Sequence, residues 1–344
     1  MIDDVISCLS IDRRTTLFEI EIEEEDDHVK LTGLVDDRDI KDKVISFYSK
    51  KCIKTITDDI NVISAEKRKG LIHVSVANLH KSPELSSQLV TQALMGTEVS
   101  IIQSRGDWWQ VRLPDGYLGW VCETVTELPG EKLQLWKDGE IAIVTSMQTW
   151  VYSEPDTNSD IVSDAVIGNQ FTLIKKHGFF IKVRYPDNRE GYITKSSCQY
   201  YREWLASRDL SGTAIVKTAK RFTGIPYLWG GASSKAVDCS GFVKMVYLLH
   251  GINLPRDADQ QALIGNRVDF GNDISKIKPG DLLFFGRRKS NEIEIPITHV
   301  GVSLGGKRYM QASGDVHISS FDGKDKEFDK RRSESLLQVR RILN

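Results

Sequence analysis

A repeat within the chain constrains its fold more than any other feature of the sequence. Residues 90–121 align with residues 162–193 without a gap, at a constant offset of 72 residues. Gly96 and Gly168 occupy the same place in the two copies, and both copies end on a glycine, an aromatic residue and a β-branched residue. Because chance similarity rarely keeps one register over such a span, the sequence predicts two copies of one small structural unit.

Each copy has the pattern of a small β-barrel. Short alternating runs are separated by turn residues, Pro-Asp-Gly in the first copy and Pro-Asp-Asn in the second, which predicts closely spaced strands. The series Gly-x-x-x-x-[Ile/Leu], Trp-x-x-Val and Gly-[Trp/Tyr]-[Val/Ile] resembles the bacterial SH3 domain. We therefore expect SH3-like barrels over residues 70–130 and 138–200. The resemblance implies binding of wall glycopeptide, and the alternative for the second barrel is a purely architectural role.

The first 66 residues predict a small α/β unit. Residues 15–25 and 28–35 alternate apolar and polar side chains, as half-buried strands do. Residues 40–52 carry apolar side chains at helical spacing, and residues 56–63 suit a closing strand. This order resembles a BON-type module over residues 1–66, and the alternative is a generic packing domain. The sequence indicates no site residue in this unit.

Composition excludes several classes of protein. The 344 residues are 40% hydrophobic and 27% charged, which is typical of a globular chain with several domains. The 46 basic and 48 acidic residues give a net charge of −2, so no nucleic-acid partner is expected. No segment approaches ~20 apolar residues, which predicts no membrane span. The acidic start lacks a secretory leader, so we expect a cytoplasmic protein if Met1 is the native start, and a periplasmic or secreted one if a leader was removed.

Cysteine usage points to one reactive residue. The five cysteines are odd in number and widely spaced, which fits neither a disulfide framework nor a metal site. Cys239 follows Asp238, a favourable helix N-cap, and precedes apolar residues at helical spacing. A thiol in the first helical turn is stabilised as a thiolate by free N–H groups and the helix dipole. The alternative for Cys239 is a buried structural cysteine, and we expect the other four cysteines to be incidental to the chemistry.

His299 is the candidate base. It lies in an alternating run over residues 297–306, about sixty residues after Cys239, and an imidazole on a strand suits a base that must reach a thiol. Its second nitrogen needs an acceptor, and Gln311 on the next strand is the candidate. A three-residue loop over residues 304–306 would place Gln311 directly opposite His299, whereas a two-residue loop would turn it away. The catalytic interpretation predicts the longer loop, and His317 is a weaker alternative acceptor.

These segments together resemble the NlpC/P60 family of cell-wall cysteine peptidases. The resemblance implies a papain-like catalytic domain over residues 208–344, and hence an α+β multidomain chain in which this domain follows both barrels. In that family the third catalytic position is most often histidine, so Gln311 departs from the common form, and pairing of the Cys239 thiolate with the His299 imidazolium would supply the missing charge. The motifs that carry the resemblance are Tyr-Leu-Trp-Gly-Gly (227–231), Asp-Cys-Ser-Gly-Phe-Val (238–243), Leu-Pro-Arg (254–256), Pro-Gly-Asp-Leu-Leu-Phe-Phe (279–285), Thr-His-Val-Gly-Val (298–302) and Gln-Ala-Ser-Gly (311–314).

The order of two barrels and a peptidase domain resembles the γ-D-glutamyl-L-diamino acid endopeptidases. The resemblance implies cleavage of murein stem peptides between D-Glu and diaminopimelate or Lys, a required free N-terminal L-Ala, and release of L-Ala-D-Glu. We expect a monomer with neither metal nor organic cofactor. A helix cap is the alternative role for Asp238, and a solvated loop acid is the alternative for Glu84. The implied substrate-binding residues are Glu84, Tyr117, Tyr227, Asp238, Ser240 and Asp257.

Three other functions remain open from the sequence. The chain could hydrolyse polymeric peptidoglycan, with the barrels as wall anchors. It could be an inactive wall-binding module, which the neutral Gln311 makes conceivable, although the intact segments around Cys239 and His299 argue against it. An acyltransferase on the same fold is the third alternative.

Overall fold

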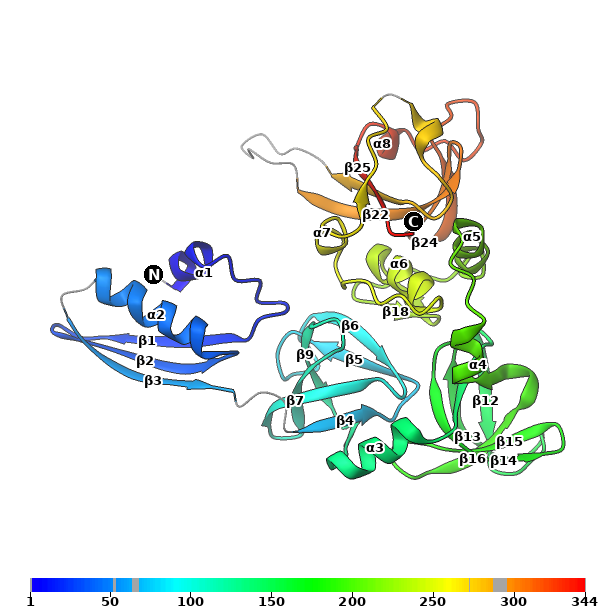
Figure 1. Ribbon diagram of the computed structural model, residues 1–344, viewed down its shortest axis with the longest axis horizontal. Coiled ribbons are helices and arrows are strands. Elements are labelled where there is room, and N and C mark those ends of the chain that lie inside the picture. Colours follow the sequence, from blue (N-terminus) through cyan, green and yellow to red (C-terminus); the bar gives the residue numbers. More distant parts are fainter. Residues whose placement is uncertain (1, 52–53, 64–67, 272, 287–295, 344) are drawn as a thin grey trace.

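The computed structural model describes residues 2–51, 54–63, 68–271, 273–286 and 296–343. An N-terminal unit, two seven-stranded sheets and a C-terminal unit follow one another along the chain. Figure 1 shows the C-terminal unit above both seven-stranded sheets, with the N-terminal unit on the side of the first sheet. No helix in this described part has the length and apolar character needed to span a membrane.

The N-terminal unit is a three-stranded sheet covered by a helix. β2 pairs antiparallel with β1 and parallel with β3, as the crossover through α2 requires. Val29 and Leu31 of β2 pack against Val44 and Tyr48 of α2 in a small core. The strand–strand–helix–strand order matches the prediction, with one extra helix before it. The elements are α1 (Ile2–Cys8), β1 (Phe18–Glu24), β2 (His28–Val35), α2 (Arg38–Lys51) and β3 (Thr55–Val62).

The two seven-stranded sheets have the same topology. The first runs β10-β4-β7-β8-β9-β5-β6, and the second, taken in the same direction, runs β17-β11-β14-β15-β16-β12-β13. Six of the seven equivalent strands begin 72 residues apart, so the sequence repeat corresponds to a structural repeat. Gly96 and Gly168 adopt positive φ values of 83° and 90° at the same turn, a conformation that favours glycine.

The strands of the first sheet are β4 (Lys69–Ile72), β5 (Val76–His80), β6 (Leu89–Leu94), β7 (Glu98–Arg105), β8 (Trp108–Arg112), β9 (Leu118–Cys122) and β10 (Val125–Glu127). Those of the second are β11 (Ile141–Val144), β12 (Gln148–Tyr152), β13 (Ile161–Val166), β14 (Gln170–His177), β15 (Phe180–Arg184), β16 (Glu190–Thr194) and β17 (Cys198–Tyr200). Helix α3 (Gly130–Asp138) joins the sheets, and the 3₁₀ turn Lys195–Ser197 precedes β17.

The C-terminal unit is a six-stranded sheet packed against helices, with the order β20-β25-β21-β22-β23-β24. Helix α6 contacts β22 and β23 at the centre of the unit's apolar core, which places the start of α6 beside β22. The helices are α4 (Tyr201–Ala206), which leads in from the second sheet, α5 (Gly212–Lys220), α6 (Cys239–Leu248), α7 (Ala258–Gln261) and α8 (Lys330–Ser333), with a 3₁₀ turn at Ile274–Lys276. The strands are β18 (Ala232–Ser233), β19 (Ala236–Val237), β20 (Asn266–Arg267), β21 (Leu282–Gly286), β22 (Ile297–Gly305), β23 (Arg308–Ser313), β24 (Asp315–Ser320) and β25 (Leu336–Arg341).

Both seven-stranded sheets pack directly on the C-terminal unit. Leu94 of the first sheet and Val166 of the second lie in the same apolar core as the residues of α6. Gln92 on β6 adds a polar contact, because its Oε1 accepts hydrogen bonds from the Ala232 N–H (3.0 Å) and the Ser233 hydroxyl (2.9 Å). These contacts hold the first sheet beside the start of α6.

Candidate active site

A cavity of about 820 Å³ lies where three parts of the chain meet. The C-terminal unit lines it with the first residues of α6, β22 and α7. The first seven-stranded sheet lines it with β9 and the turn before β9. The segment between α1 and β1 forms the third side. The residues that matter below are Cys239, His299, Tyr227, Tyr117, Asp257 and Arg14, all of which line this cavity.

Cys239 is the first residue of α6 and is only 9% exposed. Asp238 is the N-cap, and its carboxylate accepts the Gly241 N–H at 2.7 Å, as the sequence predicts. Burial raises the pKa of the Cys239 thiol to about 11 and the nearby Asp238 charge adds to this, whereas the backbone N–H groups of Val300 and Ser240 lower it. Desolvation therefore disfavours the expected thiolate more than the helix start favours it.

His299 lies on β22, directly before Val300, whose N–H acts on the Cys239 thiol. The thiol and the imidazole both line the cavity on the side of the C-terminal unit. Burial lowers the pKa of His299 to about 3, and the positive charge of Arg332 lowers it further. Both pKa shifts favour the neutral thiol and the neutral imidazole over the expected thiolate–imidazolium pair.

Gln311 contacts the far nitrogen of the imidazole, with 2.7 Å between His299 Nε2 and Gln311 Oε1. Arg332 Nε also donates to Oε1 (3.1 Å), while the Gln311 amide nitrogen donates to the Ser319 hydroxyl (2.8 Å) and to an Asp329 carboxylate oxygen (3.1 Å). Arginine is only a donor and a carboxylate only an acceptor, so these partners fix the orientation of the amide. His299 must then carry its proton on Nε2, which leaves Nδ1 as the acceptor.

The hairpin between β22 and β23 differs from both loops considered above. Val302 pairs with Met310 and Gly305 with Arg308, with a bulge between Ser303 and Gly305. Continued along the strands, this register places Gln311 opposite Gly301 instead of His299. The prediction of a direct pair was wrong because the turn lies at Gly306 and Lys307, and this turn together with the bulge moves the pairing by two residues. Gln311 still faces the same side as His299, and the absent side chain of Gly301 leaves the diagonal contact open.

His317 does not act as the alternative acceptor for His299. It lies on β24 and contacts the backbone and side chain of Asp315 through Nδ1. The described cysteines other than Cys239 do not line the cavity: Cys8 is exposed, Cys122 is half-buried and Cys198 is buried. The fifth, Cys52, lies outside the described residues.

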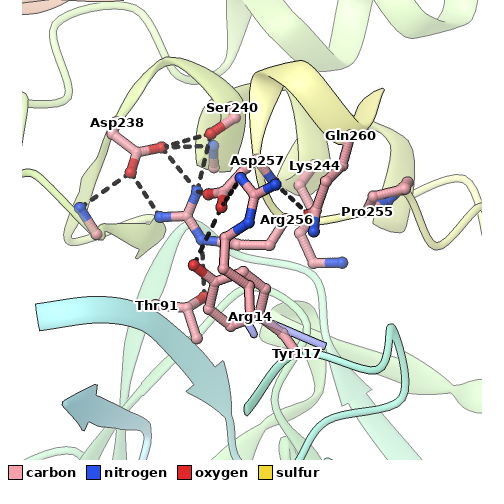
Figure 2. A network of polar contacts seen from close by, with 12 residues as sticks. Arg14, Thr91, Tyr117, Asp238, Ser240, Lys244, Pro255, Arg256, Asp257 and Gln260 are labelled. Atoms are coloured by element: carbon pink, nitrogen blue, oxygen red, sulfur yellow. Dashed lines mark hydrogen bonds and ion pairs between the residues drawn. The ribbon is translucent and has the colours of Figure 1, made fainter. Parts of the chain in front are cut away.

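Asp238 is engaged more fully than the sequence indicates, as Figure 2 shows. Arg256, which is 1% exposed, donates to both of its oxygens at 3.0 and 2.5 Å. The N–H groups of Gly230 and Gly241 and the Ser240 hydroxyl donate to the same carboxylate. Five donors fill the roughly four lone-pair directions of a carboxylate, so a substrate ammonium would have to displace one of them. The helix-cap role of Asp238 is present, and the Ser240 hydroxyl also accepts from Arg256.

Tyr117 and Asp257 come together across two units, although 140 residues separate them. The Tyr117 hydroxyl donates to Asp257 Oδ2 at 3.1 Å, and Asp257 begins α7 as its N-cap. Tyr227 lies on another part of the lining, and burial raises its pKa to about 12. Asp238 and Ser240 line it as well, so five of the six predicted substrate-binding residues surround the same cavity as Cys239.

Glu84 does not join this group. It is exposed, lies outside the lining, and contacts Ser82 of its own loop at 3.5 Å. The same loop lines the cavity with Lys81 and Gln88 instead. Glu84 is thus a solvated loop acid, which is the alternative considered for it in the sequence analysis.

Sequence reasoning missed two groups of residues at this site. Arg332 and Asp329 orient Gln311 from the start of α8. Arg14 reaches Asp257 across 243 residues of sequence. Both groups act on a residue that is distant in the sequence. Neither could therefore be recognised from its sequence neighbours.

Comparison with known proteins identifies the family. The sequence profile of the NlpC/P60 family matches residues 224–332, and the profile described as the bacterial dipeptidyl-peptidase Sh3 domain matches residues 79–124. A solved structure of an NlpC/P60 family protein from Bacillus cereus has the same fold, with a TM-score of 0.67 and 23% identity over 80% of this chain and 100% of that one.

Curated relatives agree with both profiles. The gamma-D-glutamyl-L-lysine dipeptidyl-peptidase of Bacillus cereus is 28% identical over 229 residues, which cover 64% of this chain and 66% of that protein. The dipeptidyl-peptidase 6 of Lysinibacillus sphaericus is 27% identical over 74% of this chain and 92% of its own length. A Haemophilus influenzae protein named "probable endopeptidase NlpC homolog" is 31% identical over 54% of this chain and 82% of its own length. The chain is therefore a peptidase that belongs to the NlpC/P60 family.

Proposed function

We propose that the chain is a cysteine peptidase that cleaves the bond between γ-D-Glu and the diamino acid of murein stem peptides with a free N-terminal L-Ala. The products are L-Ala-D-Glu and a peptide that begins with Lys or diaminopimelate. The observation that carries the proposal is one cavity that is lined by Cys239 and His299 and also by the hydrogen-bonded pair of Tyr117 and Asp257. The names of the Bacillus relatives support the same reaction.

The proposed reaction starts from the neutral pair. As Cys239 Sγ attacks the γ-carbonyl carbon, its proton passes to Nδ1 of His299, a carbon–sulfur bond forms, and the backbone N–H of Cys239 stabilises the oxyanion. When the intermediate collapses, the carbon–nitrogen bond breaks and His299 gives the proton to the leaving amine. Water then attacks the thioester with His299 as base, which releases the dipeptide and restores the thiol.

The charge beside Asp257 favours a substrate ammonium. Arg14 and Arg256 contact four carboxylates, those of Asp12, Asp238, Asp257 and Asp259. Lys244, the third cation drawn in Figure 2, is paired with Asp115. Four carboxylates against two guanidinium groups leave an excess of negative charge. The free amino group of L-Ala would be attracted to this end of the cavity.

We further propose the finer architecture predicted from the sequence: a BON-like unit over residues 1–66, SH3-like barrels over 70–130 and 138–200, and the peptidase domain over 208–344. The profile match to the first barrel and the shared strand order support the two barrels. The proposed enzyme acts as a monomer.

The test is mass spectrometry of the products from L-Ala-γ-D-Glu-L-Lys, from its diaminopimelate counterpart and from intact peptidoglycan sacculi. The proposal expects L-Ala-D-Glu from the two peptides, no release from sacculi, and complete loss in Cys239→Ala. Cys122→Ala is the matched control, since this half-buried cysteine lies outside the cavity. Release of products from sacculi alone would favour the wall hydrolase, and turnover by Cys239→Ala would refute the nucleophile.

A further inference from the structure

The segment between α1 and β1 forms one wall of the cavity that holds Cys239. Arg13, Arg14 and residues 16–19 of this segment face the cavity. The two family profiles match residues 79–124 and 224–332, so neither contains this wall. The wall is therefore a feature of this chain that the family resemblance leaves unexplained.

One guanidinium holds the wall in place. Arg14 donates to Asp257 at 2.9 Å and to both oxygens of Asp259 at 2.9 and 2.7 Å. It also donates twice to Asp12 of its own segment, at 2.9 and 2.8 Å. Such forked contacts restrict both the position and the orientation of arginine. Figure 2 shows Arg14 between the first sheet and the segment that carries Asp257.

Further contacts fix the same segment to two units. Gln260 of α7 donates to Asp12 at 2.9 Å, and the backbone N–H of Leu118 donates to the Arg14 carbonyl at 2.7 Å. Glu19 at the start of β1 accepts a hydrogen bond from Arg105 on β7 at 2.8 Å. The segment is thus tied to α7 on one side and to the first seven-stranded sheet on the other.

The position of Arg14 decides what the wall does. The Asp257 oxygen that accepts from Arg14 also accepts from the Tyr117 hydroxyl, and these two residues lie at the end proposed for the substrate's amino group. A substrate with a free ammonium group ends at this point. An acyl group or a further residue on that nitrogen would collide with Arg14. A larger group could enter only by breaking the forked contacts of a partly buried ion network.

We propose that residues 11–18 are a specificity wall, locked by Arg14, that excludes stem peptides extended or acylated at their N-terminus. This rests on the proposed function, because it assigns the end of the substrate that faces Asp257. The N-terminal unit then sets the length of substrate that the peptidase domain accepts.

Arg14→Met and Asp259→Asn test the wall, because each weakens the contact between Arg14 and Asp259 by changing one partner. Wild type should cleave L-Ala-γ-D-Glu-L-Lys and reject its N-acetyl and N-glycyl forms. Both variants should raise kcat/KM on the blocked peptides by about tenfold or more, the scale on which a pocket discriminates by size. Arg68→Met is the matched control, since it removes an exposed forked pair with Glu127 at 2.8 and 2.7 Å outside the cavity, and it should leave the rejection unchanged.

A second measurement does not depend on the substrate. Iodoacetamide and its bulky fluorescein derivative would be compared by their rates of alkylation of the Cys239-containing peptide, followed by mass spectrometry. Arg14→Met should accelerate the bulky reagent several-fold more than the small one. Unchanged rejection of blocked peptides together with an unchanged ratio of the two alkylation rates would overturn the wall. The wild type could fail to cleave either peptide while Arg14→Met still accelerates alkylation by the bulky reagent. That combination would overturn the proposed substrate and support the wall.

Discussion

Gln311 orients His299 without contributing a charge. All four hydrogen-bonding positions of its amide are filled, by His299, Arg332, Ser319 and Asp329. A neutral acceptor stabilises an imidazolium less than a carboxylate does, so the hydrogen bond to Gln311 raises the pKa of His299 by less than burial and the charge of Arg332 lower it. These shifts favour a resting state in which the proton is on the thiol.

Removing the amide should slow the chemistry more than it weakens binding. Gln311→Ala frees the Nε2 end of His299, so we expect kcat to fall on the order of 100-fold, within the range that general base catalysis contributes. KM should change little, because Gln311 lies outside the cavity lining. Steady-state kinetics would measure both, with Gln134→Ala on the exposed side of α3 as the control. A rise in KM at constant kcat would contradict this role.

The ionisation of His299 offers a direct pH test. Because its pKa is lowered from 6.5 to about 3, its NMR signal should show no titration step between pH 5 and 8, and the difference from a His299→Asn spectrum would assign the signal. Arg332→Met removes a neighbouring positive charge that disfavours the imidazolium, so the pKa should rise toward the ordinary value. An unchanged titration in the variant would exclude that electrostatic effect.

At the scale of elements, the β22–β23 hairpin shows what the sequence can and cannot predict. The alternation of His299, Gly301 and Ser303 correctly placed these residues on one face of a strand. The turn at Gly306 and Lys307 and the bulge between Ser303 and Gly305 were not predictable, because they follow from how the whole sheet packs rather than from the loop residues alone. The face of Gln311 was therefore predicted correctly and its opposite partner was not.

The start of α6 is held by a buried ion pair. Arg256 joins the N-cap Asp238 to Thr91 of β6, where its Nε donates to the threonine hydroxyl at 2.8 Å. A single arginine therefore connects the nucleophile helix, the loop before α7 and the first sheet. The sequence indicated Asp238 as a cap, but the pairing with a residue 18 positions later depends on the fold of the loop between them.

Breaking this pair from one side should be costly. Arg256→Met leaves the Asp238 carboxylate buried without its cation, so we expect the free energy of unfolding to fall by about 3–5 kcal/mol. Asp238→Asn in the same chain keeps the cap acceptor, removes the charge and should restore part of the loss. Urea unfolding would measure both, and Arg68→Met, which breaks an exposed pair, should cost no more than about 1 kcal/mol. Equal losses in the two arginine variants would contradict the argument.

On the scale of the whole molecule, the sequence predicted the units better than their assembly. The 72-residue repeat and the local patterns of the first 66 residues predicted two similar β units and a small α/β unit, because periodicity is a local property. The contact of Arg14 with Asp257 joins residues 243 positions apart, and no local pattern indicates such a pair. The third side of the cavity could therefore be recognised only from the assembled chain.

The repeat also gives each molecule an internal comparison. Asp115 and Asp187 occupy the same turn, and each accepts the backbone N–H two residues later, that of Tyr117 in the first copy and of Arg189 in the second. Tyr117 turns to the cavity, whereas Arg189 donates to the backbone carbonyl of His73 and binds one copy to the other. The aspartate that agrees between the copies is what this turn requires, and the residue two positions later determines whether the turn faces the cavity or joins the two copies.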